Sequence, residues 1–228
     1  MSRTTLSPAA MPPAVAHPPD DAVCAGPLAE SLLRIREPGR RLALWHRRLP
    51  AALPRWLSMH FRPPRGQCRF AIDADLVGND ALDALIADRT GLDGDDSTVR
   101  RIRRDLLDLI LLARRIAPQS PGLRVRLERI EDAGCRLFHV DQIGLRLICT
   151  YLGPGTQWLP ESAFDRQGLG CGCNDHVRDW DALREIPCGA VAVMKGERYP
   201  GNAGRGLVHR SPPASPQQPR VVLAIDLA

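Results

Sequence analysis

The chain lacks the segments and motifs that would assign it to several large classes of protein. It has no apolar run of about 18 residues, so we expect no membrane-spanning helix and no membrane partner. It also has no G-x-S-x-G, no P-loop and no G-x-G-x-x-G, which are typical of hydrolases, nucleoside triphosphatases and dinucleotide-binding folds respectively. The first residues contain no apolar run of the signal-peptide type, and we therefore expect a cytoplasmic protein.

Charge of one sign is not concentrated enough to indicate a nucleic-acid partner. The net charge is +5, and the densest basic run lies within Arg100–Arg104. Acidic residues flank that run on both sides and no aromatic residues are interleaved with it. This pattern is typical of the solvated face of a helix, so we expect no nucleic acid to bind.

Disulfide bonds are not expected either. The seven cysteines are an odd number, spread over a chain long enough to bury a core without covalent crosslinks. An apolar fraction of 44% and a charged fraction of 25% are those of an ordinary globular protein.

The chain divides into three regions by its periodicity. Residues 1–27 are rich in proline and alanine without a period, and we expect a disordered leader there. Residues 28–120 are predicted to form a mainly helical N-terminal layer. Its predicted elements are helices at 28–35, 50–59, 74–89 and 97–117 and a strand at 68–73, with 42–45 an apolar run too short to assign.

Residues 121–228 change to short alternating runs separated by turn residues. The predicted strands are Leu123–Glu128, Cys135–His139, Leu145–Tyr151, Thr156–Leu159, Ala190–Met194, Leu207–His209 and Arg220–Leu227. So many short strands predict a sandwich, a jelly roll or a barrel. The expected fold class is therefore α+β, with a helical layer packed on a β core.

A metal site is indicated by His139 and Asp141. Residues i and i+2 of an extended chain point to the same face, so an imidazole and a carboxylate would lie side by side. These are two of the three ligands of the two-histidine, one-carboxylate triad that holds non-haem Fe(II). His-x-Asp is a weak signal alone, but His209 ends a predicted strand downstream and Arg220 begins the last one. The alternative is a hydrogen-bonded polar cluster that orders the strand ends.

The pattern of His139-x-Asp141, a distant His209 and a following Arg220 resembles the Fe(II)- and 2-oxoglutarate-dependent oxygenases. The resemblance implies a C-terminal double-stranded β-helix of the jelly-roll or cupin type. It also implies Fe(II) bound by His139, Asp141 and His209, with Arg220 holding the far carboxylate of 2-oxoglutarate and Tyr151 as a hydroxyl partner for it. Arg146 or Arg210 could replace Arg220 in that role.

A closer resemblance is to a bacterial domain family of unknown function, number 1826. It rests on the segments FHVD, RLICTYLGPGTQWL, MKGE and LVHRSPP and covers residues 28–228. The family implies no reaction. The function we expect is that of an Fe(II)-dependent dioxygenase with an unidentified small-molecule or protein substrate. The alternatives are a non-catalytic, zinc-related metal-handling protein on the same barrel and an interaction protein without metal.

A second candidate metal site lies in a glycine-rich segment. Cys171, Cys173 and His176 are closely spaced, with Cys188 further along, and thiolates with imidazole suit tetrahedral Zn(II). The spacing differs from the Cys-x2-Cys pairs common in structural zinc sites. The alternative is a mobile loop whose cysteines are incidental, or a lid over the mouth of the β core.

Overall fold

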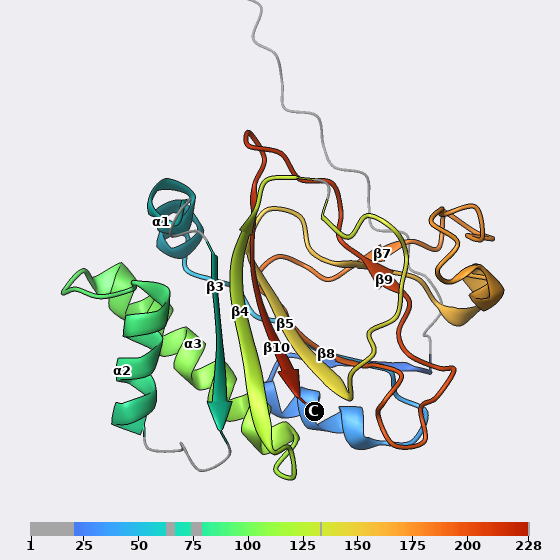
Figure 1. Ribbon diagram of the computed structural model, residues 1–228, viewed down its shortest axis with the longest axis horizontal. Coiled ribbons are helices and arrows are strands. Elements are labelled where there is room, and N and C mark those ends of the chain that lie inside the picture. The colour runs from blue at the N-terminus through green and yellow to red at the C-terminus, as the bar shows by residue number, and fades with distance from the viewer. Residues whose placement is uncertain (1–20, 63–66, 74–78, 133, 228) are drawn as a thin grey trace, which may run out of the picture.

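The fold, seen in a computed structural model that describes residues 21–62, 67–73, 79–132 and 134–227, is a mixed α+β arrangement around one large sheet (Figure 1). That sheet has seven strands in the order β1-β2-β8-β5-β10-β4-β3, and every neighbouring pair is antiparallel except the parallel pair β1–β2. A smaller antiparallel sheet has the order β7-β6-β9. The strands are β1 (Val23–Gly26), β2 (Leu42–Trp45), β3 (Gln67–Asp73), β4 (Gly122–Ile130), β5 (Leu145–Leu152), β6 (Gln157–Trp158), β7 (Arg184–Glu185), β8 (Val191–Lys195), β9 (His209–Arg210) and β10 (Arg220–Leu227).

One face of the large sheet packs against helices. The helices are the 3₁₀ helix η1 (Ala29–Arg36), α1 (Ala52–His60), α2 (Asn79–Thr90) and α3 (Ser97–Ile116), with two short 3₁₀ turns, η2 (Glu161–Ala163) and η3 (Arg166–Gly168), further on. Figure 1 shows α1, α2 and α3 on the opposite side of the large sheet from β7 and β9. The odd-numbered residues of β4, β5 and β10 join helix residues in the main core, among them Leu127, Leu147 and Leu223.

Helix α3 follows directly from its sequence. Asp96 caps its N-terminus by accepting hydrogen bonds from the backbone N–H groups of Thr98 (2.7 Å) and Val99 (3.2 Å). Its apolar residues recur every three to four positions and are buried, so the predicted amphipathic helix is confirmed. A single apolar stripe is what a helix lying across a sheet requires.

The other face of the large sheet encloses a second core. Ile148 of β5 and Val222 of β10 contact Trp158 of β6 and Leu207, which precedes β9. These even-numbered sheet residues lie opposite the helix-facing set because side chains alternate along a strand. The two sheets therefore face each other across an apolar layer and a cavity.

The predicted N-terminal layer is not a separate helical layer. β2 pairs with β8 and β3 pairs with β4, so residues 28–120 supply strands on both sides of the C-terminal strands. The predicted disordered leader is also partly wrong: residues 1–20 lie outside the described ranges, but β1 pairs with β2 and buries Cys24. Runs of four residues carry too little period for prediction, and pairing with a neighbouring strand decides their structure.

The segment Cys135–His139, predicted as a strand, has no ladder of its own. Its one bridge joins His139 to His209. The first part of the helix predicted at 74–89 lies outside the described residues. None of the helices in the described ranges has both the length and the apolar character that a bilayer-spanning helix requires.

Candidate metal centre

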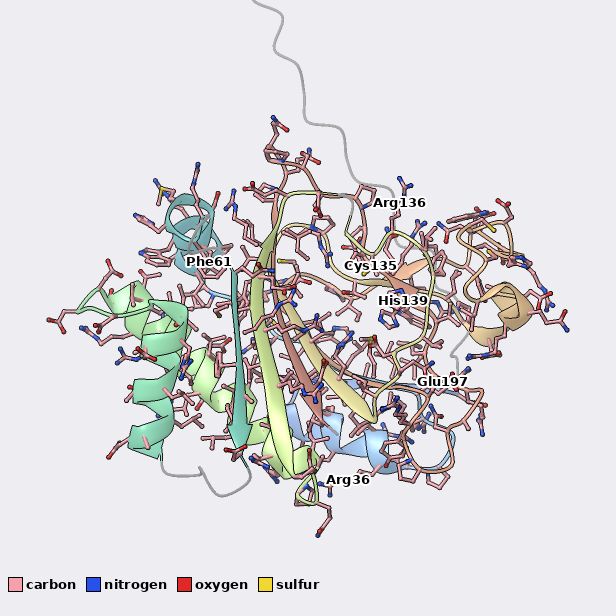
Figure 2. All side chains as sticks on the ribbon, in the orientation of Figure 1. Arg36, Phe61, Cys135, Arg136, His139 and Glu197 are labelled. Carbon is pink, nitrogen blue, oxygen red and sulfur yellow. The ribbon has the colours of Figure 1, made fainter. Side chains whose placement is uncertain are left out.

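Three side chains from two distant segments converge between the sheets. One ligand atom from each of His139, Asp141 and His209 lies within 4.8 Å of the other two. His139 and Asp141 belong to the segment between β4 and β5, and His209 begins β9. Figure 2 shows His139 beside β9, away from α1–α3. We call these three residues the central site.

A pair of backbone hydrogen bonds brings the two histidines together. The N–H of His139 donates to the carbonyl of His209, and the N–H of His209 donates to the carbonyl of His139, each over 3.0 Å. The imidazole centroids are consequently 4.5 Å apart. Proximity of two residues far apart in the chain is thus achieved by a single antiparallel bridge.

Both imidazoles are oriented in the same way. Nδ1 of His139 lies 2.9 Å from the carbonyl oxygen of Leu137, and Nδ1 of His209 lies 2.9 Å from that of Leu207. A carbonyl only accepts, so in each neutral ring Nδ1 carries the proton and donates it. The lone pair is then on Nε2, which faces Asp141 in both cases, at 4.0 Å from Oδ1 for His139 and 3.5 Å from Oδ2 for His209.

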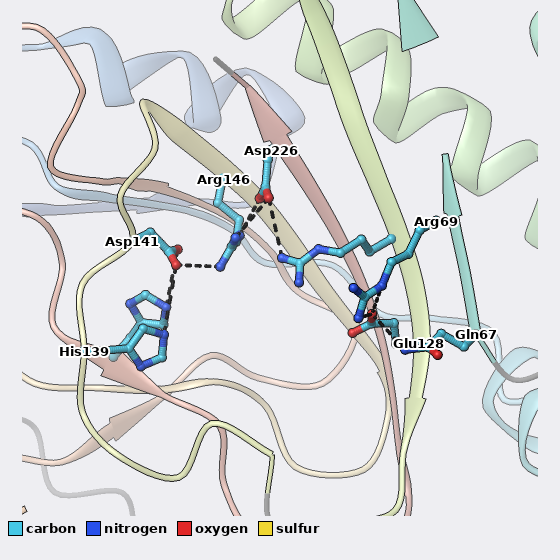
Figure 3. A network of polar contacts seen from close by, with 9 residues as sticks. Gln67, Arg69, Glu128, His139, Asp141, Arg146 and Asp226 are labelled. Carbon is cyan, nitrogen blue, oxygen red and sulfur yellow. Dashed lines mark hydrogen bonds and ion pairs between the residues drawn. The ribbon is translucent and has the colours of Figure 1, made fainter. Parts of the chain in front are cut away.

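Asp141 is held through only one of its oxygens. Arg146 Nη1 donates to Asp141 Oδ1 over 2.7 Å, while buried Oδ2 has no hydrogen-bond partner. Arg146 is itself fixed by Asp226, to which Nε and Nη2 donate over 2.6 Å and 3.0 Å (Figure 3). Burial acts to lower the pKa of Arg146, but the carboxylates of Asp226 and Asp141 together raise it above its ordinary value.

Burial keeps His209 neutral. The residue is 5% exposed, and this burial lowers the pKa of His209 to about 4, against the opposing effect of the Asp141 carboxylate. A neutral ring with its lone pair on Nε2 is the form that binds a metal. Because no hydrogen bond joins the three side chains of the central site, the structure does not favour the hydrogen-bonded polar cluster.

The backbone that carries Asp141 packs closely against the segment at Gly196 and Glu197. The N–H of Glu197 donates to the carbonyl of Asp141 over 2.9 Å. A Cβ on Gly196 would lie 2.6 Å from that same carbonyl oxygen and 2.3 Å from that of Ile143. The MKGE segment therefore requires glycine at 196 to pack against the chain that carries Asp141.

The central site opens on a cavity of about 350 Å³. Residues that line it include His139, His209, Arg146, Arg210, Thr156 and Val222. The cavity has the size of a pocket for a small molecule or for one side chain of a larger one.

Arg220 is almost completely buried beside this cavity. It is 1% exposed, and its Nε donates to the carbonyl of Pro154 over 2.7 Å, but neither Nη1 nor Nη2 has a hydrogen-bond partner. Burial lowers the pKa of Arg220 to about 10, although Glu185 and Cys188 favour the charged form. Arg220 does not itself line the cavity. Two of its neighbours line the cavity instead: Val222, two residues along the same face of β10, and Ile130, which pairs with Arg220 across β4 and β10.

The Gly153-Pro154-Gly155 turn shapes the surroundings of Arg220. Gly153 has φ +81°, and a Cβ there would lie 3.0 Å from Arg220 Cγ. A Cβ on Gly155 would lie 1.6 Å from the carbonyl oxygen of Ile186. Both glycines are required because the chain passes too close to its neighbours for any side chain.

The structure does not bring Tyr151 to the central site. Tyr151 lies on the helix-facing side of β5, and its hydroxyl donates to Asp105 Oδ2 of α3 over 2.6 Å. A hydroxyl on that face cannot contact a ligand in the cavity. Arg146 lines the cavity but is bound by two carboxylates, and Arg210 donates from Nε to Gln157 Oε1 over 2.8 Å. Of these arginines, Arg220 has both terminal nitrogens buried without a partner.

Sequence reasoning missed Asp226. It fixes the guanidinium that fixes Asp141, and it lies opposite Arg146 in the β5–β10 register. Its signal was present in the sequence, because it is a lone carboxylate in the apolar run RVVLAIDL. A charge in such a run requires a partner, but the partner's identity depends on strand register.

The family model for "Protein of unknown function (DUF1826)" matches residues 28–226. The chain belongs to this family. The match covers every residue of the central site and also Arg146, Arg220 and Asp226. No curated protein matches the chain.

Three solved structures are among those to which the chain is similar. A prolyl-4-hydroxylase from Pseudomonas putida is 13% identical over 88% of this chain and 98% of its own, with a TM-score of 0.43. A putative oxygenase from Shewanella oneidensis is 11% identical over 90% and 88%, with a TM-score of 0.48. HygX from Streptomyces hygroscopicus, solved with iron bound, is 11% identical over 78% and 86%, with a TM-score of 0.33. At these scores the likeness carries no argument about chemistry, which rests on the side chains of this chain.

Proposed function

We propose that this protein is an Fe(II)-dependent oxygenase with 2-oxoglutarate as co-substrate, and that its two facing sheets form a double-stranded β-helix. The observation that carries the proposal is the central site itself. One ligand atom from each of His139, His209 and Asp141 lies within 4.8 Å of the other two, and the buried Oδ2 of Asp141 has no hydrogen-bond partner. A buried carboxylate oxygen without a partner, facing two imidazoles, favours a cation between them.

The donor set fits Fe(II). Two imidazoles and one carboxylate form the facial triad that leaves coordination positions open. When bound, the iron would supply activation of dioxygen. His139 and His209 would hold it through Nε2, and Asp141 through Oδ2, because Arg146 already occupies Oδ1. Arg146 and Asp226 act as positioning residues that orient the carboxylate.

Arg220 fits the co-substrate. Its two terminal nitrogens are buried without a partner and lie outside the cavity wall, so the wall has to open for a carboxylate to reach them; they can then donate two parallel hydrogen bonds to it. A dicarboxylate could then be held at one end by Arg220 and chelate the metal at the other. Thr156 and Val222, which line the cavity, would contact the part of the dicarboxylate between its two ends.

The first experiment measures anaerobic Fe(II) binding by calorimetry. We expect about one equivalent to bind at the central site in the wild type, with binding lost in His139→Ala and in Asp141→Ala. His60→Ala is the control, because this exposed ring stacks on Trp56 of the same helix. Equal Fe(II) affinity in the wild type and both central-site variants would overturn the proposal.

The second experiment measures conversion of 2-oxoglutarate to succinate without added substrate. We expect Arg220→Gln to raise the KM for 2-oxoglutarate about tenfold or more while Fe(II) affinity is unchanged, since guanidinium–carboxylate pairs contribute about 1.5–3 kcal/mol. Arg101→Gln serves as the arginine control, because this exposed residue lies on α3, on the other side of the large sheet from β9. Metal binding without any succinate would instead support a non-catalytic metal-handling protein on the same fold.

A further inference from the structure

A second group of metal-binding side chains lies in the segment between η3 and β7. One ligand atom from each of Cys171, Cys173 and His176 lies within 4.8 Å of the other two. We call these three residues the loop site. In a tetrahedral zinc site with Zn–S bonds of about 2.3 Å, two sulfurs lie roughly 3.8 Å apart. The loop site thus needs only a small contraction to close around an ion. The structure does not bring Cys188 to it, since that thiol donates to the carbonyl of Thr150 over 3.4 Å.

The glycines of this segment are placed where the loop site needs them. Gly170 and Gly172, on either side of Cys171, have φ +87° and +79°, a conformation that other residues adopt at a cost. Gly168 has a different role, because a Cβ there would lie 1.8 Å from Cγ of His176. The backbone at Gly168 therefore packs directly on the imidazole and fixes its position. The glycines shape a specific arrangement of the loop.

Backbone hydrogen bonds hold the Cys171 thiol. The N–H of Cys173 donates to Sγ of Cys171 over 3.2 Å, and the thiol donates to the carbonyl of Cys173 over 3.4 Å. A backbone donor stabilises a thiolate, and a cation between the two sulfurs would remove their mutual repulsion.

We propose that Cys171, Cys173 and His176 bind a zinc ion, with water in the fourth position. Two soft thiolates and one imidazole favour Zn(II) over the harder cations that carboxylate sites select. Binding would replace one proton on each thiol, so two protons are released for each Zn(II) bound to the neutral imidazole and the two thiols. The proposal does not depend on the iron site.

Asn174 of the loop segment contacts the chain that leads into the central site. Asn174 Oδ1 accepts from the backbone N–H of Phe138 over 2.9 Å, and its Nδ2 donates to the carbonyl of Arg136 over 3.2 Å. Phe138 immediately precedes His139 and packs in a small core with Phe164 and Val177, on either side of the loop site. A zinc ion that fixes residues 171–176 would therefore also fix the chain entering the central site.

The experiment measures the metal content of full-length protein purified with and without added Zn(II), under reducing conditions, by elemental analysis. We expect Cys171→Ser/Cys173→Ser to lose one equivalent of zinc and Asp141→Ala to retain it. Cys135→Ser/Cys188→Ser is the matched control, because both of these cysteines are also free and exposed. Replacing zinc by Co(II) should give a thiolate-to-cobalt absorption band that is absent from Cys171→Ser/Cys173→Ser.

Two outcomes would overturn the loop site. One is zinc content that the Cys171→Ser/Cys173→Ser variant retains in full. The other is a wild type with no zinc and no cobalt–thiolate band, with or without a Cys171–Cys173 disulfide in the mass spectrum. Both results are independent of Fe(II) binding and of succinate formation, so this proposal and the oxygenase proposal fail separately.

Discussion

The central site and the loop site use opposite means of bringing ligands together. The central site takes His139 and His209 from distant segments and joins them by a backbone bridge that the whole sheet supports. The loop site takes all its ligands from residues 171–176 and shapes them with glycines. We infer that the central site is formed before metal binds, whereas the order of the loop depends on its ion.

The largest expected effect is loss of iron with retention of zinc in Asp141→Asn. The amide keeps the shape of the side chain but removes the charge that faces Nε2 of His209. Loss of a supporting residue alone lowers metal affinity about 10–100-fold, so removal of this ligand should lower Fe(II) affinity by at least about 100-fold. Calorimetry with Fe(II) and elemental analysis for zinc are the measurements. Simultaneous loss of both metals would show that the two sites are not separate.

A pair of glycine substitutions should affect one site each. Gly196→Ala places a methyl group against the carbonyl of Asp141, and Gly168→Ala places one in the ring of His176. Overpacking costs about 1–3 kcal/mol, and a cost of that size in the metal-bound state corresponds to about fivefold or more in affinity. We expect Gly196→Ala to weaken Fe(II) binding only and Gly168→Ala to weaken zinc binding only. Neither glycine has a positive φ, so backbone strain does not complicate the comparison.

A smaller effect is expected where the two sites meet. Asn174→Ala removes two hydrogen bonds to the segment that precedes His139. A hydrogen bond of this kind contributes about 1 kcal/mol, so Fe(II) affinity should fall about fivefold. In a double-substitution cycle with Cys171→Ser/Cys173→Ser, the effects should be less than additive, since both act through the same loop. Fully additive effects of the two sets of substitutions on Fe(II) affinity would show that the loop site does not influence the central site.

The smallest effect concerns thiols that belong to neither site. Burial raises the pKa of Cys149 to about 12 and that of Cys68 to about 11. At pH 8 these thiols stay protonated in the folded protein, so iodoacetamide should leave them unmodified while exposed Cys135 reacts. The folded state then holds protons that the unfolded state releases above pH 9. Burial of these thiols therefore contributes stability that is lost as pH rises from about 9 to about 12. Mass spectrometry and pH-dependent denaturation check the two statements.

Prediction from the sequence succeeded where a regular period was long. The helix predicted at 97–117 was confirmed as α3, and the strand predicted at Arg220–Leu227 was confirmed as β10. It failed for β1 and β2, since four residues carry no usable period and these strands exist because β8 pairs with β2. The strand expected at 135–139 failed for the opposite reason: its alternation has no partner strand except at His139.

Tyr151 shows a further limit of prediction from the sequence. The alternation of β5 places Tyr151 on the face of Leu147 and Cys149, opposite Arg146 and Ile148. Which of these faces meets the cavity depends on where α3 packs, and α3 packs on the face of Tyr151. Sequence period assigns residues to shared faces, but it does not say what each face contacts.

The sequence by itself determined the donor atoms and their local geometry. The His-x-Asp spacing predicted that His139 and Asp141 share a face, and the loop site is confined to six residues in a glycine-rich segment. Only the tertiary structure decided that His209 lies opposite His139, that Asp226 holds Arg146, and that Arg220 is buried without a partner. The reason is physical: these contacts depend on the register between strands far apart in the chain, which no local spacing specifies.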